Sequence, residues 1–324
     1  STDLFGFFND LLNAGSTGKH LYYRLDAHYS DLTDPLDLII RAPFLAGFPV
    51  VDDVDQLRRS EATVNFELGW KGNGWDVAAG YTFYMIDFND DIFEQANHKR
   101  NTGWLEFGIG LGGSGETRIY VRGEYSDLDF TEELLNNAEV WSGVLGVDGM
   151  LFSKKIRYDI NAGYLNWDPQ LTGVVGDTND YSGGVGWGQI VYRPLMHRKM
   201  FLQLEGGRKV DWSAISNYRI DDTILFTFRD ELMPERLDLD VTAQYSHHEQ
   251  SEGPRWDRLE LGFGLIYHPH RQVDVRLRYL YRQQDSDEDY EIENTAVIDG
   301  DVTTIATNGN FDQHVISLGV EVRF

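Results

Sequence analysis

The sequence contains no cysteine, which excludes disulfide bonds, thiolate metal sites and a cysteine nucleophile. It has only 8 prolines beside 33 glycines and 13% aromatic residues, a composition that favours strands and turns over helices. No apolar run approaches the length of a transmembrane helix, and the mean hydropathy is -0.40. Basic residues are scarce, with 28 against 53 acidic ones and a net charge of -25. This surplus of negative charge argues against nucleic acid as a partner.

A period of two dominates the chain from His20 onward. In residues 61–70, EATVNFELGW, every second residue is apolar and the residues between are polar or small. Comparable segments lie near residues 20–30, 75–87, 103–112, 117–126, 139–152, 156–165, 200–210, 218–229, 236–247, 257–267, 272–282 and 311–324. The Gly-rich segment 181–192 has an ambiguous parity, which predicts a bulge there. Together these segments predict about fourteen strands, each long enough to cross a bilayer when tilted. Aromatic residues near the strand ends are expected to form interfacial girdles, among them Trp70, Trp75, Trp104, Trp141, Tyr267 and Tyr281.

The connections between these segments alternate between short and long. Short ones read KGNG, GGSGE, SKK, PLMHRK, ELMPE and HPHRQ, and long ones include 31–58, 88–101, 127–138, 167–180, 248–256 and 283–310. The connection near 211–217 is the one exception, because the alternation places it in the long set although it is short. An up-and-down barrel with both termini in the periplasm requires this alternation. We therefore predict an all-β fold over residues 17–324, a transmembrane antiparallel up-and-down β-barrel of about 14 strands.

The last segment, FDQHVISLGVEVRF at 311–324, has one almost purely apolar face and ends on Phe324. An edge strand of a soluble sandwich is the alternative interpretation. The segment resembles the C-terminal strand of Gram-negative outer-membrane β-barrels. The resemblance implies a cell outer-membrane location, contact with the lipid bilayer and lipopolysaccharide, and recognition of Phe324 by the barrel-assembly machinery. The pattern that begins with FDQH also looks like the barrel proteins that accompany exopolysaccharide export, which implies a conduit for a secreted glycan.

Residues 1–16 differ from the rest, because their apolar residues recur at helical spacing between a candidate N-cap, Asp3, and a candidate stop, Gly15. We expect a short amphipathic helix that plugs the barrel, docks on a periplasmic partner or packs at the rim. The apolar stretch 38–50 is expected to fold inward as a constriction or to contact a partner. No leader precedes Ser1, so the numbering of an exported protein would describe its mature form.

The polar faces of the predicted strands carry nearly equal numbers of basic and acidic residues, so we expect most of the net charge in the loops. The candidate pore-lining basic residues are Arg24, Arg118, Arg122, Arg258, Arg276, Arg278, Arg282 and Arg323. The candidate pore-lining acidic residues are Glu61, Glu67, Asp76, Glu106, Asp238, Asp240, Glu260, Asp274 and Glu321. Such a wall either lines an aqueous pore or closes the lumen through ion pairs between its basic and acidic side chains.

The densest positive stripe is formed by Arg276, Arg278 and Arg282, next to Arg258 and Arg323. One interpretation is a ladder for an anionic or polyhydroxyl solute, opposed by the early carboxylates at positions 61, 67, 76 and 106. The other interpretation is structural, with the arginines neutralised by Asp238, Glu260, Asp274 and Glu321.

Two further motifs have weak signals. The acidic loops 30–37, 87–91 and 285–294 offer oxygen ligands for calcium but lack EF-hand spacing. The sequence therefore leaves open whether these loops bind a metal ion. The stretch 245–261 faintly resembles the catalytic region of outer-membrane phospholipase A. His247 and His248 lie four and three residues from Ser251, and Asp257 replaces the family's asparagine. In an extended strand neither histidine is both adjacent to this serine and on its face.

The sequence predicts a passive pore or conduit for solutes or for a secreted polymer such as a polysaccharide, with the charged wall setting selectivity. The alternative is a non-conducting sheath or docking barrel whose lumen holds a helix, a loop or another protein. A lipid hydrolase is a remote third possibility, and we expect no enzyme activity and no cofactor. A periplasmic partner would bind through residues 1–16.

Overall fold

The computed structural model describes residues 21–35, 56–88, 96–111, 117–131, 135–152, 154–171, 173, 177–194, 200–213, 216–253, 255–270, 272–287, 294–298, 301–305 and 310–322. The expected helix at 1–16, the apolar stretch 38–50, Arg323 and Phe324 lie outside these residues. Among the residues described, no helix is long and apolar enough to cross a membrane.

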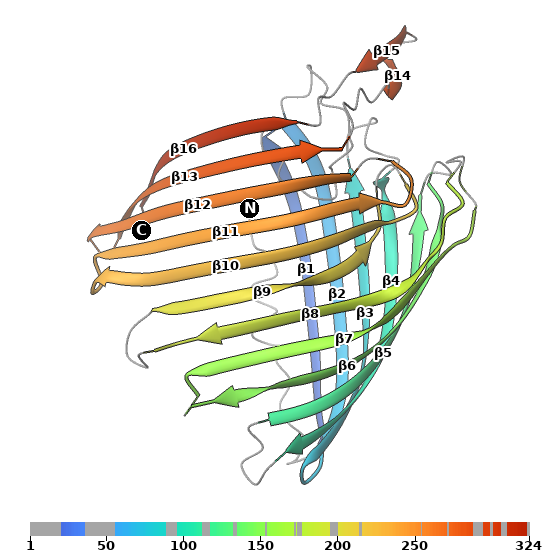
Figure 1. Ribbon diagram of the computed structural model, residues 1–324, viewed down its shortest axis with the longest axis horizontal. Helices are drawn as coiled ribbons and strands as arrows, with labels where there is room; N and C mark the ends of the chain where they lie inside the picture. The colour runs from blue at the N-terminus through green and yellow to red at the C-terminus, as the bar shows by residue number, and fades with distance from the viewer. Residues whose placement is uncertain are drawn as a thin grey trace.

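Fourteen strands form one continuous antiparallel sheet, in the order in which they follow each other along the chain (Figure 1). They are β1 (Leu21–Pro35), β2 (Gln56–Lys71), β3 (Trp75–Phe88), β4 (His98–Leu111), β5 (Thr117–Phe130), β6 (Ala138–Leu151), β7 (Ile156–Pro169), β8 (Tyr181–Tyr192), β9 (Phe201–Asp211), β10 (Arg219–Met233), β11 (Leu237–Gln250), β12 (Arg255–His270), β13 (Val273–Ser286) and β16 (Phe311–Val322). A separate hairpin, β14 (Asn294–Ile298) with β15 (Asp301–Ile305), lies in the connection between β13 and β16. The predicted fold class and strand count are confirmed.

The strand ends confirm the alternation of connections. β2 and β3 are separated by residues 72–74, β6 and β7 by 152–155, and β10 and β11 by 234–236, whereas β1 and β2 are separated by 36–55. The connection between β11 and β12 is shorter than expected, at 251–254, because both strands extend further than their apolar pattern predicts. We call the two ends of the sheet the short-turn end and the loop end.

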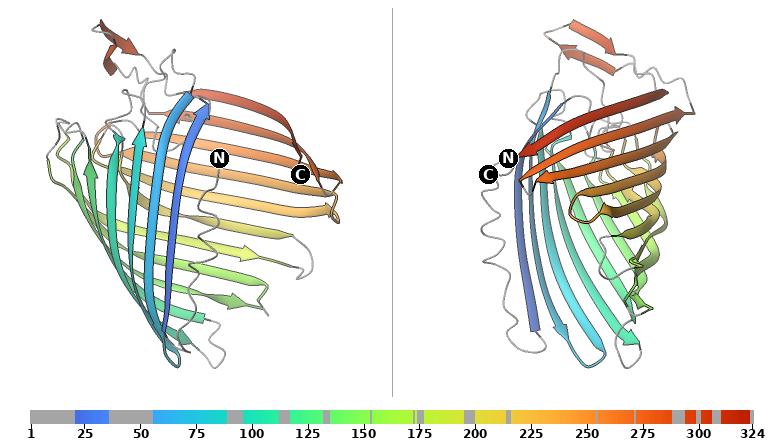
Figure 2. Two further views of the ribbon diagram at one scale, coloured as in Figure 1. Left: turned by 180° about the vertical axis from the view of Figure 1, so that it is seen from behind. Right: turned by 90° about the vertical axis from the view of Figure 1, so that its left-hand side faces the viewer.

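The sheet is strongly curled, and its two edge strands are β1 and β16. In Figures 1 and 2, β1 runs nearly upright while β16 lies across it at a steep angle, so the two edges do not run side by side along their length. In the described part of the chain no ladder joins β1 to β16, so hydrogen bonds do not close the curl into a complete cylinder.

The outer face of the sheet is an apolar belt, as the parity of the sequence predicts. On β4 the exposed apolar side chains are Leu105, Phe107, Ile109 and Leu111, and Leu145 on β6 is 63% exposed. A contiguous apolar surface of this kind in water would promote aggregation, whereas in a bilayer it contacts lipid. The outer face is therefore the lipid-facing side.

Two local expectations are wrong. The ladders of β8 with β7 and β9 keep a regular register, so the Gly-rich strand is not bulged; register shifts occur instead at Glu231/Met233 and Tyr267/His270. Trp104, expected in an interfacial girdle, lies on the inner face, where the Arg122 guanidinium sits 4.4 Å from the centroid of its ring. Its even position on β4 gives it the same orientation as Glu106.

Candidate functional site on the inner face

The inner face near the short-turn end is organised around Arg118 of β5. Its guanidinium donates to Asp76 of β3 at 2.6 and 2.9 Å, to Asp148 of β6 at 3.0 Å, and to Glu106 of β4. Gly108 makes this arrangement possible, because a Cβ there would lie 2.3 Å from the Arg118 Nε. One arginine thus engages carboxylates from three nearby strands and offsets part of their negative charge. We call these four residues, Arg118, Asp76, Glu106 and Asp148, the Arg118 hub.

The other early carboxylates also have local partners. Arg122 contacts Glu106 at 4.0 Å and Glu124 at 3.0 Å. Glu61 pairs with Arg59 at 2.6 Å. Arg24 pairs with Asp26 at 2.5 Å, and both line a shallow hollow together with Glu67 and Trp104. Three of the four predicted early carboxylates, Glu61, Asp76 and Glu106, therefore pair with arginines of their own strand group.

Most arginines of the predicted positive stripe are paired in the same way. Arg282 lies 2.9 Å from Glu260, and Arg276 lies 3.6 Å from Asp274. Arg258 donates to Gln284 at 2.6 Å and lies 4.0 Å from Glu260. These pairs match the structural interpretation of the stripe.

Three aspartates of these strands also have charged or histidine partners. His268 lies 2.6 Å from Asp274 and 3.5 Å from Asp238. Asp240 pairs with Arg229 at 2.7 Å. Glu321 of β16 stands opposite Asp274 in the ladder.

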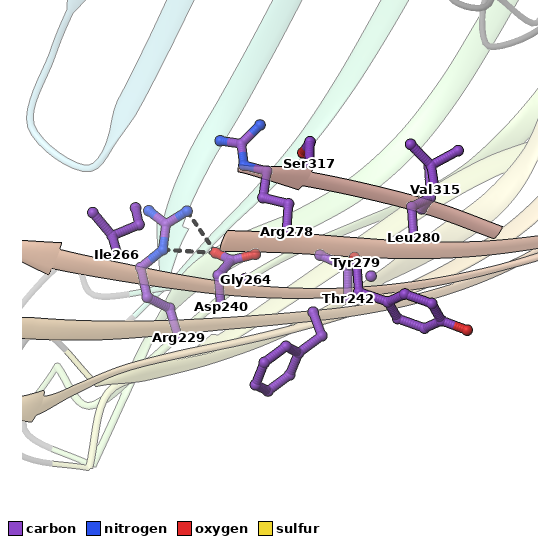
Figure 3. A pocket seen from close by; sticks show the side chains of 12 residues that line it. Arg229, Asp240, Thr242, Gly264, Ile266, Arg278, Tyr279, Leu280, Val315 and Ser317 are labelled. Carbon is purple, nitrogen blue, oxygen red and sulfur yellow. Dashed lines mark hydrogen bonds and ion pairs between the residues drawn. The ribbon is translucent and has the colours of Figure 1, made fainter. Parts of the chain in front are cut away.

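Arg278 is the exception. No hydrogen bond or ion pair joins it to another residue that the structure describes, and its side chain is exposed. It borders a hollow of about 370 Å³ on the inner face, together with Asp240, Arg229 and Ser317 (Figure 3). Figure 3 shows Arg229 bonded to Asp240 while Arg278 projects separately. The structure thus divides the predicted stripe into arginines that have polar partners and Arg278, which forms no hydrogen bond or ion pair with another described residue.

The loop end is filled by a packed core that links distant strands. Trp212, in the connection between β9 and β10, packs its ring 4.5 Å from His98 of β4 and edge-on to Phe130 of β5. Nearby, Arg100 of β4 pairs with Asp211 of β9 at 3.0 Å. These contacts join β4 and β5 to the end of β9 and the residue that follows it. Trp212, at the start of the connection that is shorter than the alternation predicts, is therefore buried against the opposite strands. We call this region the loop-end core.

A buried polar knot completes the loop-end core. Asp177 accepts hydrogen bonds from the backbone N–H groups of Asn179 and Asn217, both at 2.9 Å, and from the Ser251 hydroxyl. Asn136 donates to Asn217 at 2.7 Å. Burial raises the pKa of Tyr218, whose hydroxyl donates to the backbone carbonyl of residue 180 at 3.1 Å. Each of these polar groups has a partner, so the knot is sealed and rigid.

Sequence reasoning missed one arrangement. His248 contacts Asp221 through Nδ1 at 2.5 Å and Ser246 through Nε2 at 2.9 Å, because Ser246 and His248 share one face of β11. Ser251, weighed from the sequence, bonds to Asp177 instead. Ser246 is 1% exposed, so no acyl group reaches its hydroxyl. The sequence does contain a signal for this contact, because Ser246 and His248 are two residues apart in a strand and therefore lie on the same face.

No group of three or more potential ligand side chains is arranged to hold a metal ion within the described ranges. Each of the acidic loops considered for calcium, 30–37, 87–91 and 285–294, lies partly outside the residues that the structure describes.

Comparisons with known proteins give distant structural likenesses. No family model matches the sequence, and no curated protein matches it. The alcaligin outer-membrane receptor FauA of Bordetella pertussis aligns at 8% identity and TM-score 0.49 over 96% of this chain, which spans 56% of that protein. The outer-membrane channel DcaP of Acinetobacter baumannii aligns at 9% identity and TM-score 0.45, over 96% of this chain and 100% of that one. OmpT of Vibrio cholerae aligns at 10% identity and TM-score 0.35, over 93% and 98%.

The structural class of the protein follows from its own architecture. Fourteen antiparallel up-and-down strands carry an apolar belt outside and charged residues inside. Sheets of this kind cross a bilayer because their strands satisfy the backbone hydrogen bonds of one another and their outward side chains are mostly apolar; among the described residues only the edges β1 and β16 are not joined. The chain therefore has the architecture of an outer-membrane-type up-and-down β-barrel protein.

Proposed function

We propose that the protein is an outer-membrane conduit for polar solutes, with its inner charged face as the wall and the loop-end core as a closed gate. The observation that carries the proposal is the contrast between the two faces of the sheet. The outer belt is apolar, while the inner face holds cross-strand ion pairs and a hollow that contains an exposed arginine. A wall of this chemistry suits an aqueous passage.

The gate is part of the proposal because the loop-end core spans the interior. Trp212 and Asp211 connect the β9–β10 side to His98 and Arg100 on β4. Opening requires that Trp212 and the connection it belongs to leave these contacts. Passage of a secreted polymer such as a polysaccharide is the narrower proposal; it is supported only by the resemblance of the final strand to export-associated barrels.

A non-conducting sheath is the second candidate function. The sealed polar knot around Asp177 favours it, as do the edges β1 and β16, which no ladder joins within the described residues, because a partner protein could occupy the interior. Residues 1–16 are the proposed contact for a periplasmic partner. Lipopolysaccharide and the barrel-assembly machinery are proposed partners of the outer belt and of Phe324.

Single-channel conductance in a planar bilayer tests the proposal. The full chain is compared with Trp212→Ala, with a variant lacking residues 1–16, and with Trp141→Ala, which removes an indole from the outer face as a matched control. We expect low conductance from the full chain, a steady increase from Trp212→Ala, and no increase from Trp141→Ala. Silence of every form, with folding confirmed by circular dichroism, would contradict the conduit and favour the sheath.

A further inference from the structure

The hollow around Arg278 lies in one cross-strand row of the inner face. Arg229 of β10 stands opposite Asp240 of β11, Asp240 opposite Gly264 of β12, Gly264 opposite Arg278 of β13, and Arg278 opposite Ser317 of β16. The row therefore holds two guanidinium groups and one carboxylate. Asp240 is engaged by Arg229, with an Nε to Oδ2 distance of 2.9 Å.

The neighbouring rows do not neutralise Arg278. On one side the row of Thr242, Gly262, Leu280 and Val315 carries no charge. On the other side Arg276 contacts Asp274, a residue that His268 also engages. An exposed arginine that forms no ion pair with another residue described in the structure is a ready partner for an incoming anion.

The floor of the hollow is open because two glycines face it. Gly264 has no side chain between Asp240 and Arg278, and Gly262 has none beside Thr242. A volume of about 370 Å³ lies within the size range of small-molecule sites. Hydroxyl groups of Ser317 and Thr242 line the same space and can bond to ligand hydroxyls.

We infer that this hollow is a binding subsite for a small hydroxylated oxyanion, held through its anionic group by Arg278 and through its hydroxyls by Ser317 and Thr242. The inference deepens the proposed conduit, on which it rests, by naming the class of solute. The planar guanidinium can bond a carboxylate or a phosphate through two parallel N–H groups. A neutral sugar of the same size lacks the charge-assisted contact.

Isothermal titration of the full chain in detergent, at one fixed ionic strength, tests the subsite with D-gluconate, glucose 6-phosphate and neutral glucose. We expect gluconate or glucose 6-phosphate to bind at least about tenfold more tightly than glucose, since a hydrogen bond to a charged group contributes an effect of that order. Binding of only one of the two anions identifies the carboxylate or the phosphate as the preferred group.

Three variants locate the binding. Arg278→Gln should weaken anion binding about tenfold or more. Gly264→Val should also weaken it by filling the hollow without changing charge. Its Cβ would lie 3.7 Å from the Asp240 Cβ and 3.9 Å from the Arg278 Cγ, which are ordinary contacts, and circular dichroism checks that the variant folds. Arg157→Gln, the same charge change on an exposed arginine of β7, is the matched control and should bind as the unaltered chain does.

Equal binding of glucose and the two anions, or an unchanged affinity in Arg278→Gln, would overturn the subsite. The same preparations are measured in bilayers to separate the two claims. Conductance without anion binding would refute the subsite and leave the conduit standing. Anion binding that Arg278→Gln abolishes, in a protein whose Trp212→Ala form stays silent, would confirm the subsite and refute the conduit.

Discussion

Replacing Arg118 with glutamine tests whether the inner ion pairs stabilise the barrel. The substitution removes the donors to Asp76, Glu106 and Asp148 and leaves three carboxylates facing each other. Breaking a buried charge pair costs about 3–5 kcal/mol. The Arg118 side chain is 23% exposed, and lumen water screens the carboxylates that remain, so the lower end of the scale applies. Because this screening brings the cost to or below the lower end of that scale, we expect a loss of about 2–3 kcal/mol in the free energy of unfolding.

Urea unfolding of the protein in lipid vesicles, followed by tryptophan fluorescence, measures this loss. The matched variant is Arg229→Gln, whose pair with Asp240 is more exposed, at 53% for the arginine, and should cost less than about 1 kcal/mol. Adding Glu106→Gln to Arg118→Gln should restore part of the lost stability by removing one unpaired carboxylate. Equal stability of Arg118→Gln and the unaltered chain, or no recovery in the double variant, would refute the bracing role of the hub.

Two further predictions concern the outer belt and the loop-end core. Leu145→Arg puts a charge on an outward position of β6 that is 63% exposed. It should destabilise the folded, bilayer-inserted form by about 2–4 kcal/mol. Normal insertion of this variant into vesicles, measured by protease protection, would contradict the lipid-facing assignment. Asp177→Ala leaves the N–H groups of Asn179 and Asn217 without their acceptor and should cost about 2–3 kcal/mol, seen as a lower urea midpoint. Asp180→Ala is the matched control, because this neighbouring aspartate is exposed and should tolerate alanine; equal midpoints for the two variants would contradict the role of the knot.

The strands could be predicted from the sequence because the pattern that defines them is local. A strand places alternate residues on opposite faces whatever its neighbours are, so segments such as 61–70 and 103–112 identify their own lipid face. Turn lengths then fix the up-and-down order. Trp104 escaped this reasoning because it was assigned by residue type, although its parity with Glu106 places it inside.

The inner face could be predicted only as a set of residues. Parity identified Arg118 and Arg278 as lumen-facing with equal justification. It could not say that Gly108 lets Arg118 reach three carboxylates, or that Arg229 engages Asp240 and leaves Arg278 exposed. These differences depend on the cross-strand register, which local patterns specify only indirectly.

By itself, the sequence determined the class of the protein, its topology and the side of the sheet that meets lipid, because composition, parity and loop length are properties of short segments. Tertiary structure alone decided which charges pair, where the hollow lies and what fills the loop end. Trp212 and His98 are far apart in the chain, and they meet only because the curled sheet brings β4 to the connection after β9. Contacts between such distant segments arise from the curvature of the whole sheet, and no local pattern in the chain encodes them.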